Sequence, residues 1–69
     1  MNLRERVAQN IIDRRKSVGL SQENLAKRAG VSRSHLGKLE NARHSASVET
    51  VEKIARALDL DVDVLFEPR

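Results

Sequence analysis

Apolar residues recur at intervals of three or four along five stretches of the chain, which is the spacing of an amphipathic helix. The first stretch covers residues 2–18, and the last is short, from Val62 to Phe66. No segment alternates with a period of two, so no β-sheet is expected. The pattern predicts an all-α protein of five helices. The residues expected to face inward are Leu3, Val7, Ile11 and Val18, then Leu25, Ala26 and Ala29, then Leu36 and Leu39, and finally Val48, Val51, Ile54, Ala55 and Leu58.

Each of these stretches begins at or directly after a residue whose side chain favours a helix start, because its oxygen can accept a hydrogen bond from a first-turn N–H group. The expected caps are Asn2, Ser21, Ser32, Ser47 and Asp61. Gly30 lies between the second and third helices and is suited to the left-handed conformation that helix ends often require. The sequence therefore predicts two short helices separated by a tight turn at Gly30.

The third helix has an apolar inner face and a cationic outer face. Its inward residues are leucines, and Glu40 lies at the edge of this apolar face. The outward face carries two cations and no acid between them, and its members are Arg33, Ser34, Gly37, Lys38 and Asn41. Such a face suits contact with an anionic partner, although the same pattern is also typical of an ordinary solvated surface.

The segments RRKSVGLSQENLAKRAGVS, LEN and SVETVEKIARALDLDVDVLF, with the spacing between them, resemble the lambdoid phage repressor, Cro and Xre family of helix-turn-helix DNA-binding proteins. The resemblance extends from about Val7 to Phe66. It implies a compact five-helix repressor-like domain spanning residues 1–69, with residues 66–69 expected to be frayed. In such a domain, the third helix enters the DNA major groove and the second crosses the backbone.

The resemblance assigns roles to individual residues. Arg33 is the best candidate to read a base, since arginine can donate two hydrogen bonds to guanine. Ser34 and Lys38 match other base-contacting positions, while Gln22 and Arg43 match positions that contact the backbone. The alternative interpretation of Gln22 is an ordinary helix-start residue. The expected DNA-binding residues are Gln22, Ser32, Arg33, Ser34, His35, Gly37, Lys38 and Arg43.

For two of these residues, two interpretations of their role remain open. His35 lies between the inner and outer faces, so it either packs at the boundary or contacts a phosphate. Gly37 either allows close approach of the helix to DNA or is simply tolerated at an exposed site, where glycine costs about 1 kcal/mol relative to alanine.

Arg15 and Glu40 match an arginine and a glutamate that pair in the family, and we expect them to clamp the first helix to the third rather than to contact DNA. Two residues depart from the family pattern in the loop that follows. Ala42 replaces a helix-ending glycine, so Asn41 or Ala42 must adopt a left-handed or strained geometry. Ala46 replaces a common proline, which leaves the fold unaffected.

Composition narrows the possible functions. The 69-residue chain has a net charge of +3, with ten Lys/Arg against four Asp/Glu in residues 1–44 and three against six in residues 45–69. It has no cysteine, and its two histidines are nine residues apart with no carboxylate at ligand spacing, so no cofactor, metal site or catalytic group is expected. No apolar run approaches the roughly 20 residues that span a bilayer, and a soluble cytoplasmic protein is expected.

These observations favour sequence-specific binding of double-stranded DNA by a transcriptional regulator, most simply a repressor. A single recognition helix reads few base pairs, so we expect a homodimer on two half-sites. The C-terminal part, with Val62, Leu65 and Phe66, is the expected dimer surface, although an aromatic residue such as Phe66 more often fills the core than an interface. The alternatives are an antitoxin with a toxin partner, a restriction-modification controller, and a protein-interaction module that does not read DNA.

Overall fold

The computed structural model describes residues 1–69 and contains five helical elements. In chain order they are α1 (Leu3–Ser17), α2 (Gln22–Ala29), α3 (Arg33–Glu40), α4 (Val48–Ala57) and the 3-10 helix η1 (Val62–Phe66). The all-α prediction is confirmed, with the last helix a 3-10 helix rather than an α-helix. None of the helices combines the length and the apolar character needed to cross a membrane.

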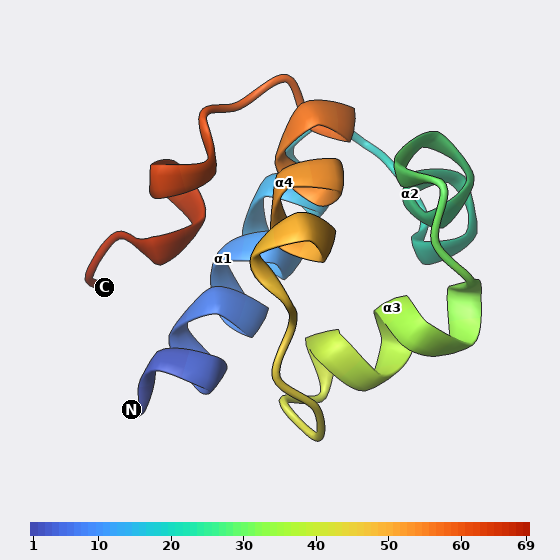
Figure 1. The fold of residues 1–69 in the computed structure, drawn as a ribbon. Helices are drawn as coiled ribbons and strands as arrows, with labels where there is room; N and C mark the ends of the chain where they lie inside the picture. The colour runs from blue at the N-terminus through green and yellow to red at the C-terminus, as the bar shows by residue number, and fades with distance from the viewer.

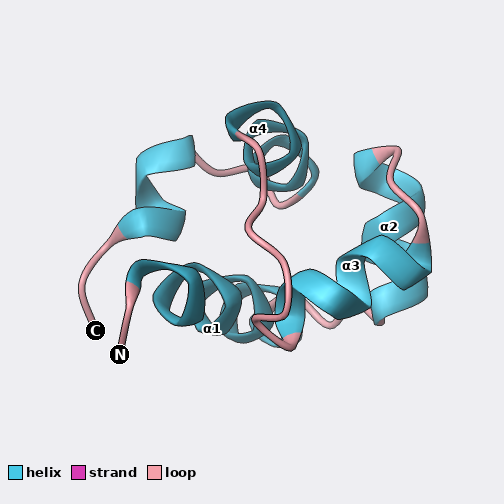
Figure 2. Cartoon of the chain, turned by 60° about the horizontal axis from the view of Figure 1, so that its bottom comes forward, coloured by secondary structure: helices cyan, strands magenta, loops and turns pink.

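The helices enclose one cluster of buried side chains. In Figures 1 and 2, α1 and α4 form the centre, the α2–α3 pair lies on one side of them and η1 on the other. α4 packs against α2 and η1, while α1 packs against α3 and η1. Every element contributes to the cluster, and its fully buried large side chains are Ile11, Leu25, Leu36, Val51, Ile54 and Leu65.

Three apolar residues expected to face inward are instead exposed. Leu3, Val18 and Val48 have exposed fractions of 51%, 55% and 67%. Leu3 and Val48 open their helices and Val18 follows the end of α1, so each projects beyond the elements that cover the middle of its helix. Ala8, which the pattern did not single out, is buried.

Four of the five predicted caps form. The hydroxyls of Ser21, Ser32 and Ser47 accept hydrogen bonds of 3.0, 3.0 and 3.1 Å from the N–H groups three residues ahead. Asn2 takes part in a reciprocal capping box with Glu5. The prediction for Asp61 was wrong, because its side chain makes no capping hydrogen bond. η1 thus has no side-chain cap, and its Leu65 is fully buried in the core.

The four α-helices all end in the same way. A residue with positive φ follows each helix, and the N–H group after it donates to a carbonyl five residues back, which satisfies a carbonyl that the helix leaves free. Glycine holds this position after α1 and α2, whereas Ala42 (φ 58°) and Asp59 (φ 59°) hold it after α3 and α4. The expected strain near Ala42 is confirmed, while that at Asp59 was not foreseen.

Of the tail, residues 66–69, Phe66 belongs to η1, and Glu67 and Arg69 form hydrogen bonds with Asn10 of α1. The Asn10 amide donates to the carbonyls of Leu65 and Glu67 at 2.9 and 3.0 Å. Arg69 in turn donates to Asn10 Oδ1 at 2.9 Å. A single asparagine of α1 therefore anchors both the end of η1 and the segment after it.

Asp13 completes this contact, since its carboxylate lies 2.6 Å from Arg69 Nη2. Hydrogen bonds from Gln9 and Arg69 lower the pKa of Asp13 below its ordinary value. Because the pKa in the folded state is the lower one, the carboxylate stabilises the docked tail at neutral pH. This contribution is lost as the pH falls through the folded pKa.

The left-handed conformation of Ala42 predicts that Ala42→Gly stabilises the protein. Glycine adopts this conformation without a Cβ clash, and we expect the free energy of unfolding to rise by about 1 kcal/mol. Urea denaturation measures the change. Ala46→Gly, in the same loop but with negative φ, is the matched control and should give no gain. Equal effects of the two substitutions would contradict the strain at Ala42.

Candidate nucleic-acid interface

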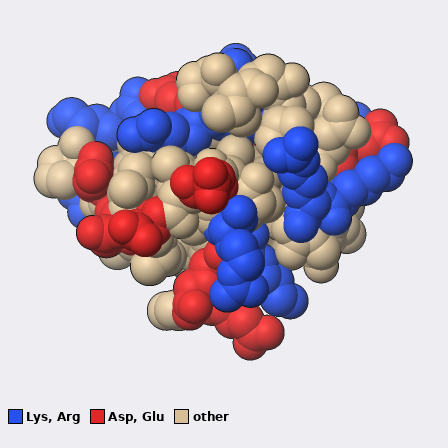
Figure 3. Space-filling view, turned by 90° about the horizontal axis from the view of Figure 1, so that it is seen from above, with Lys and Arg blue, Asp and Glu red and all other residues tan.

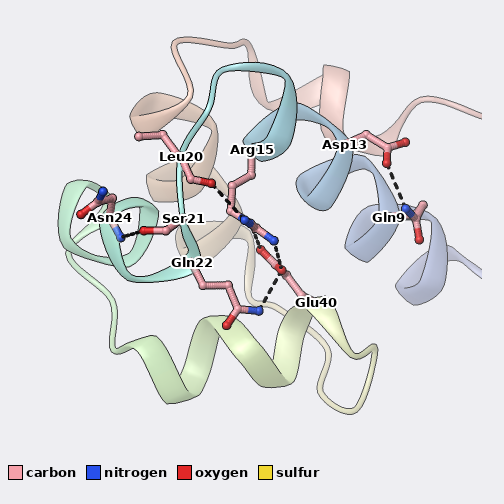
Figure 4. A network of polar contacts seen from close by, with 8 residues as sticks. All are labelled: Gln9, Asp13, Arg15, Leu20, Ser21, Gln22, Asn24 and Glu40. Atoms are coloured by element: carbon pink, nitrogen blue, oxygen red, sulfur yellow. Dashed lines mark hydrogen bonds and ion pairs between the residues drawn. The ribbon is translucent and has the colours of Figure 1, made fainter.

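The centre of the helix-turn-helix region is a buried ion pair between α1 and α3. Arg15 Nε and Nη2 donate to the two carboxylate oxygens of Glu40, at 2.9 and 3.1 Å (Figure 4). Only 13% of the Arg15 side chain and 3% of the Glu40 side chain are exposed. The expected clamp between the first and third helices is therefore confirmed, and its two-pronged geometry is the strong form of this contact.

Two further hydrogen bonds extend this pair to α2 and to the connection before it. Arg15 Nη1 donates to the Leu20 carbonyl at 3.0 Å, next to the Ser21 cap. The Gln22 amide donates to Glu40 Oε1 at 2.9 Å (Figure 4). Glu40 thus joins the end of α3 to the start of α2 as well as to α1.

The link from Gln22 to Glu40 was missed at the level of sequence. The two residues are eighteen positions apart and no periodicity connects them. Gln22 is half-buried, so its side chain has a structural partner in addition to its expected place near the DNA backbone.

The outward face of α3 is free of intramolecular partners at its charged positions. Arg33, Ser34 and Lys38 are exposed, and neither Arg33 nor Lys38 forms a hydrogen bond or ion pair through its side chain. The only acid in α3 is Glu40, which points the other way into the buried cluster. α3 therefore presents two unpaired cations on its outer side.

The remaining α3 positions have mixed surroundings. His35 is half-buried, as its place at the boundary of the two faces predicted. Ser32 is exposed, but its hydroxyl already accepts the His35 N–H. A Cβ at Gly37 would meet only Gln22 Oε1, at an ordinary 3.8 Å, so internal packing does not require glycine there.

Arg43 lies just beyond α3 in the loop before α4. Its side chain is exposed and has no partner, and its backbone N–H closes the turn at Ala42 by donating to the Lys38 carbonyl at 3.0 Å. Hence the turn fixes the backbone from which Arg43 projects. In Figures 1 and 2, this loop and α3 lie along the same lower side of the molecule.

The opposite side has a different charge pattern. Figure 3 views the molecule from above, away from α3 in Figure 1, and shows acidic and basic side chains interspersed. The face seen in Figure 3 therefore differs from the outer face of α3, which has cations and no acid.

The buried position of Glu40 predicts that Glu40→Ala strongly destabilises the fold. Removing the carboxylate leaves the Arg15 charge buried and unpaired, and we expect a loss of about 3–5 kcal/mol in the free energy of unfolding. Glu49→Ala is the control, since Glu49 pairs with Lys53 at the surface (3.8 Å) and its loss should cost less than about 1 kcal/mol. Similar urea midpoints for the two variants would contradict the role of Glu40.

Comparison with known proteins agrees with this geometry. Residues 11–65 match the helix-turn-helix family. The ImmF control region 10 kDa protein of Bacillus phage phi105 is 42% identical over 55 residues, which cover 80% of this chain and 61% of that protein. The HTH-type transcriptional regulator SinR of Bacillus subtilis is 34% identical over 64 residues, covering 91% of this chain and 58% of SinR. The chain thus spans about three fifths of the length of these two relatives.

Solved structures are similar over nearly the whole chain. SinR in complex with DNA superimposes with a TM-score of 0.84 at 34% identity, covering 88% of this chain and 98% of that one. The restriction-modification controller protein C.AhdI from Aeromonas hydrophila gives a TM-score of 0.89 at 35% identity, covering 91% and 96%. These matches confirm the resemblance carried by the sequence motifs: the chain belongs to the helix-turn-helix family, whose members include DNA-binding transcriptional regulators and phage repressors.

Proposed function

We propose that this protein binds double-stranded DNA sequence-specifically as a homodimer and represses transcription by occluding a promoter. The observation that carries the proposal is the outward face of α3, which is exposed, cationic and free of acids, on a helix held in place by the buried Glu40 cluster. The proposed role is binding alone, without catalysis.

In this proposal, Arg33 reads the DNA sequence directly. It is the first residue of α3, its side chain is exposed and unpaired, and the N-terminal end of a recognition helix faces the base edges. Two hydrogen bonds to guanine O6 and N7 are worth about 1–3 kcal/mol of discrimination. Ser34 and Lys38, exposed on the same face, are the next candidates, with Lys38 favouring guanine.

Phosphate contacts are proposed on both sides of α3. At the start of α2, the free backbone N–H groups and the positive end of the helix dipole favour a phosphate. The Gln22 amide already donates to Glu40, so only its remaining hydrogen is available there. Arg43, exposed in the loop after α3, is the proposed backbone contact on the other side, and His35 and Gly37 border the groove-facing surface.

The proposed dimer uses the C-terminal part, with one correction to the expected surface. Leu65 is fully buried and therefore belongs to the core. Val62, Val64 and Phe66 are half-buried and remain as the apolar groups of η1 that a second copy could cover. A dimer would place two α3 helices on half-sites about one helical turn apart.

A restriction-modification controller is the second candidate function. It is favoured by the similarity to C.AhdI, because this chain covers 96% of that controller at a TM-score of 0.89. Such a protein would use the same DNA-reading face, so the two candidates differ in the promoter that is bound rather than in the contacts made. A toxin partner stays a prediction that co-purification tests.

Selection of binding sites from random duplexes tests the proposal. The wild-type protein should enrich a site with two related halves, and Arg33→Ala should lose preference at one base position per half-site at a cost of about 1–3 kcal/mol. Arg56→Ala, an exposed arginine of α4 outside the proposed interface, is the control and should keep the full preference. Failure of the wild-type protein to retain any duplex would favour the protein-interaction module, while uniform weakening by Arg33→Ala would make Arg33 a phosphate contact.

A further inference from the structure

We propose that Arg4, at the start of α1, is a further DNA-contacting residue, which binds backbone phosphate together with Arg43 and His44 of the loop after α3. This inference rests on the proposed DNA-binding function. It extends the interface from α3 to a part of the chain that the helix-turn-helix motif does not include.

A contact between distant parts of the chain places Arg4 at this loop. Arg4 Nε donates to Ser45 Oγ at 3.2 Å, although the two residues are 41 positions apart. The same two side chains and His44 are among the residues that line a mostly apolar hollow of about 380 Å³, to which α1, the loop, α3, α4 and η1 contribute. In Figure 1, the beginning of α1 and this loop both lie toward the lower end of the molecule.

The Ser45 contact orients the guanidinium without using its charge. Only Nε is engaged, and neither Nη group of Arg4 has a hydrogen-bond partner. The side chain is exposed. The guanidinium of Arg4 is thus held through Nε, while its two Nη groups are available to an anion. This is the geometry that arginine uses with phosphate oxygens.

No ion pair joins Arg4 or Arg43 to a carboxylate. Arg43 and His44 are exposed and take part in no ion pair. Glu5, next to Arg4 in sequence, accepts the backbone N–H of Asn2 at 3.0 Å in the capping box. Glu49, in the first turn of α4, pairs with Lys53. The guanidinium groups of Arg4 and Arg43 are therefore free to pair with an external anion.

The dimensions of DNA favour a phosphate as that anion. The eight residues of α3 give a helix about 12 Å long, close to the major-groove width of about 12 Å. A helix of this length in the groove brings the loop that follows it to the flanking sugar-phosphate backbone. Arg4 is hydrogen-bonded to Ser45 of that loop. Its guanidinium therefore contacts the sugar-phosphate backbone and not the base edges.

Salt dependence of DNA binding separates this role from a purely structural one. For B-DNA, log K falls with log salt concentration by about 0.9 for each phosphate neutralised. We expect Arg4→Gln to reduce this slope by about 0.9 per protomer and to weaken binding equally for the selected site and for an unrelated duplex. Circular dichroism melting establishes that the variant is folded.

Two further variants serve as controls. Arg56→Gln removes the same charge from α4, outside the proposed interface, and should leave the slope unchanged. Ser45→Ala removes the hydrogen bond but keeps the Arg4 charge, so it should largely retain the slope. If Arg4 only holds the loop, Ser45→Ala will weaken binding as much as Arg4→Gln, and neither will change the slope.

The two proposals can fail separately. If the wild-type protein binds no duplex in a salt-dependent manner, the proposed function itself is overturned. If the wild-type protein binds DNA and Arg4→Gln keeps the wild-type slope, the function stands and the role of Arg4 is overturned.

Discussion

The structure depends on one buried carboxylate. Glu40 accepts two hydrogen bonds from Arg15 and one from Gln22, and thereby joins the ends of three helices at a single point. A carboxylate that is almost fully buried is tolerated only when charge and hydrogen bonds compensate its desolvation, so the three donors and Glu40 require one another. In a domain of 69 residues with a small apolar core, such a contact decides how α2 and α3 are oriented.

The same contact explains how the outer face of α3 becomes available for binding. Leu36, Leu39 and Glu40 occupy the inner side, the first two in the core and the third in the polar cluster. The cations of α3 are left without intramolecular partners, because the only acid of the helix is engaged inside. The outer face therefore stays cationic, because the carboxylate of Glu40 is engaged on the inner side of the helix.

Local signals in the sequence predicted much of the fold. The serine caps, the turn at Gly30 and the buried residues in the middle of each helix follow from contacts within a few positions. The Arg15–Glu40 pair was expected only through the family resemblance, since its partners are 25 positions apart. The Gln22 link, the docking of the tail on Asn10 and the exposure of Val48 depend on how helices meet, and no periodicity encodes that. The exposure of Arg33 and Lys38 agrees with the expected interface, while their DNA contacts remain predictions.

The most direct test of the account is a map of backbone amide chemical shifts as a selected duplex is added to the protein. We expect large shifts for the first turns of α2 and α3 and for the loop around Arg43, with the α4 end near Arg56 unchanged. Large shifts confined to α4 and η1, with α3 unaffected, would contradict the claim that the Glu40 cluster presents α3 to DNA.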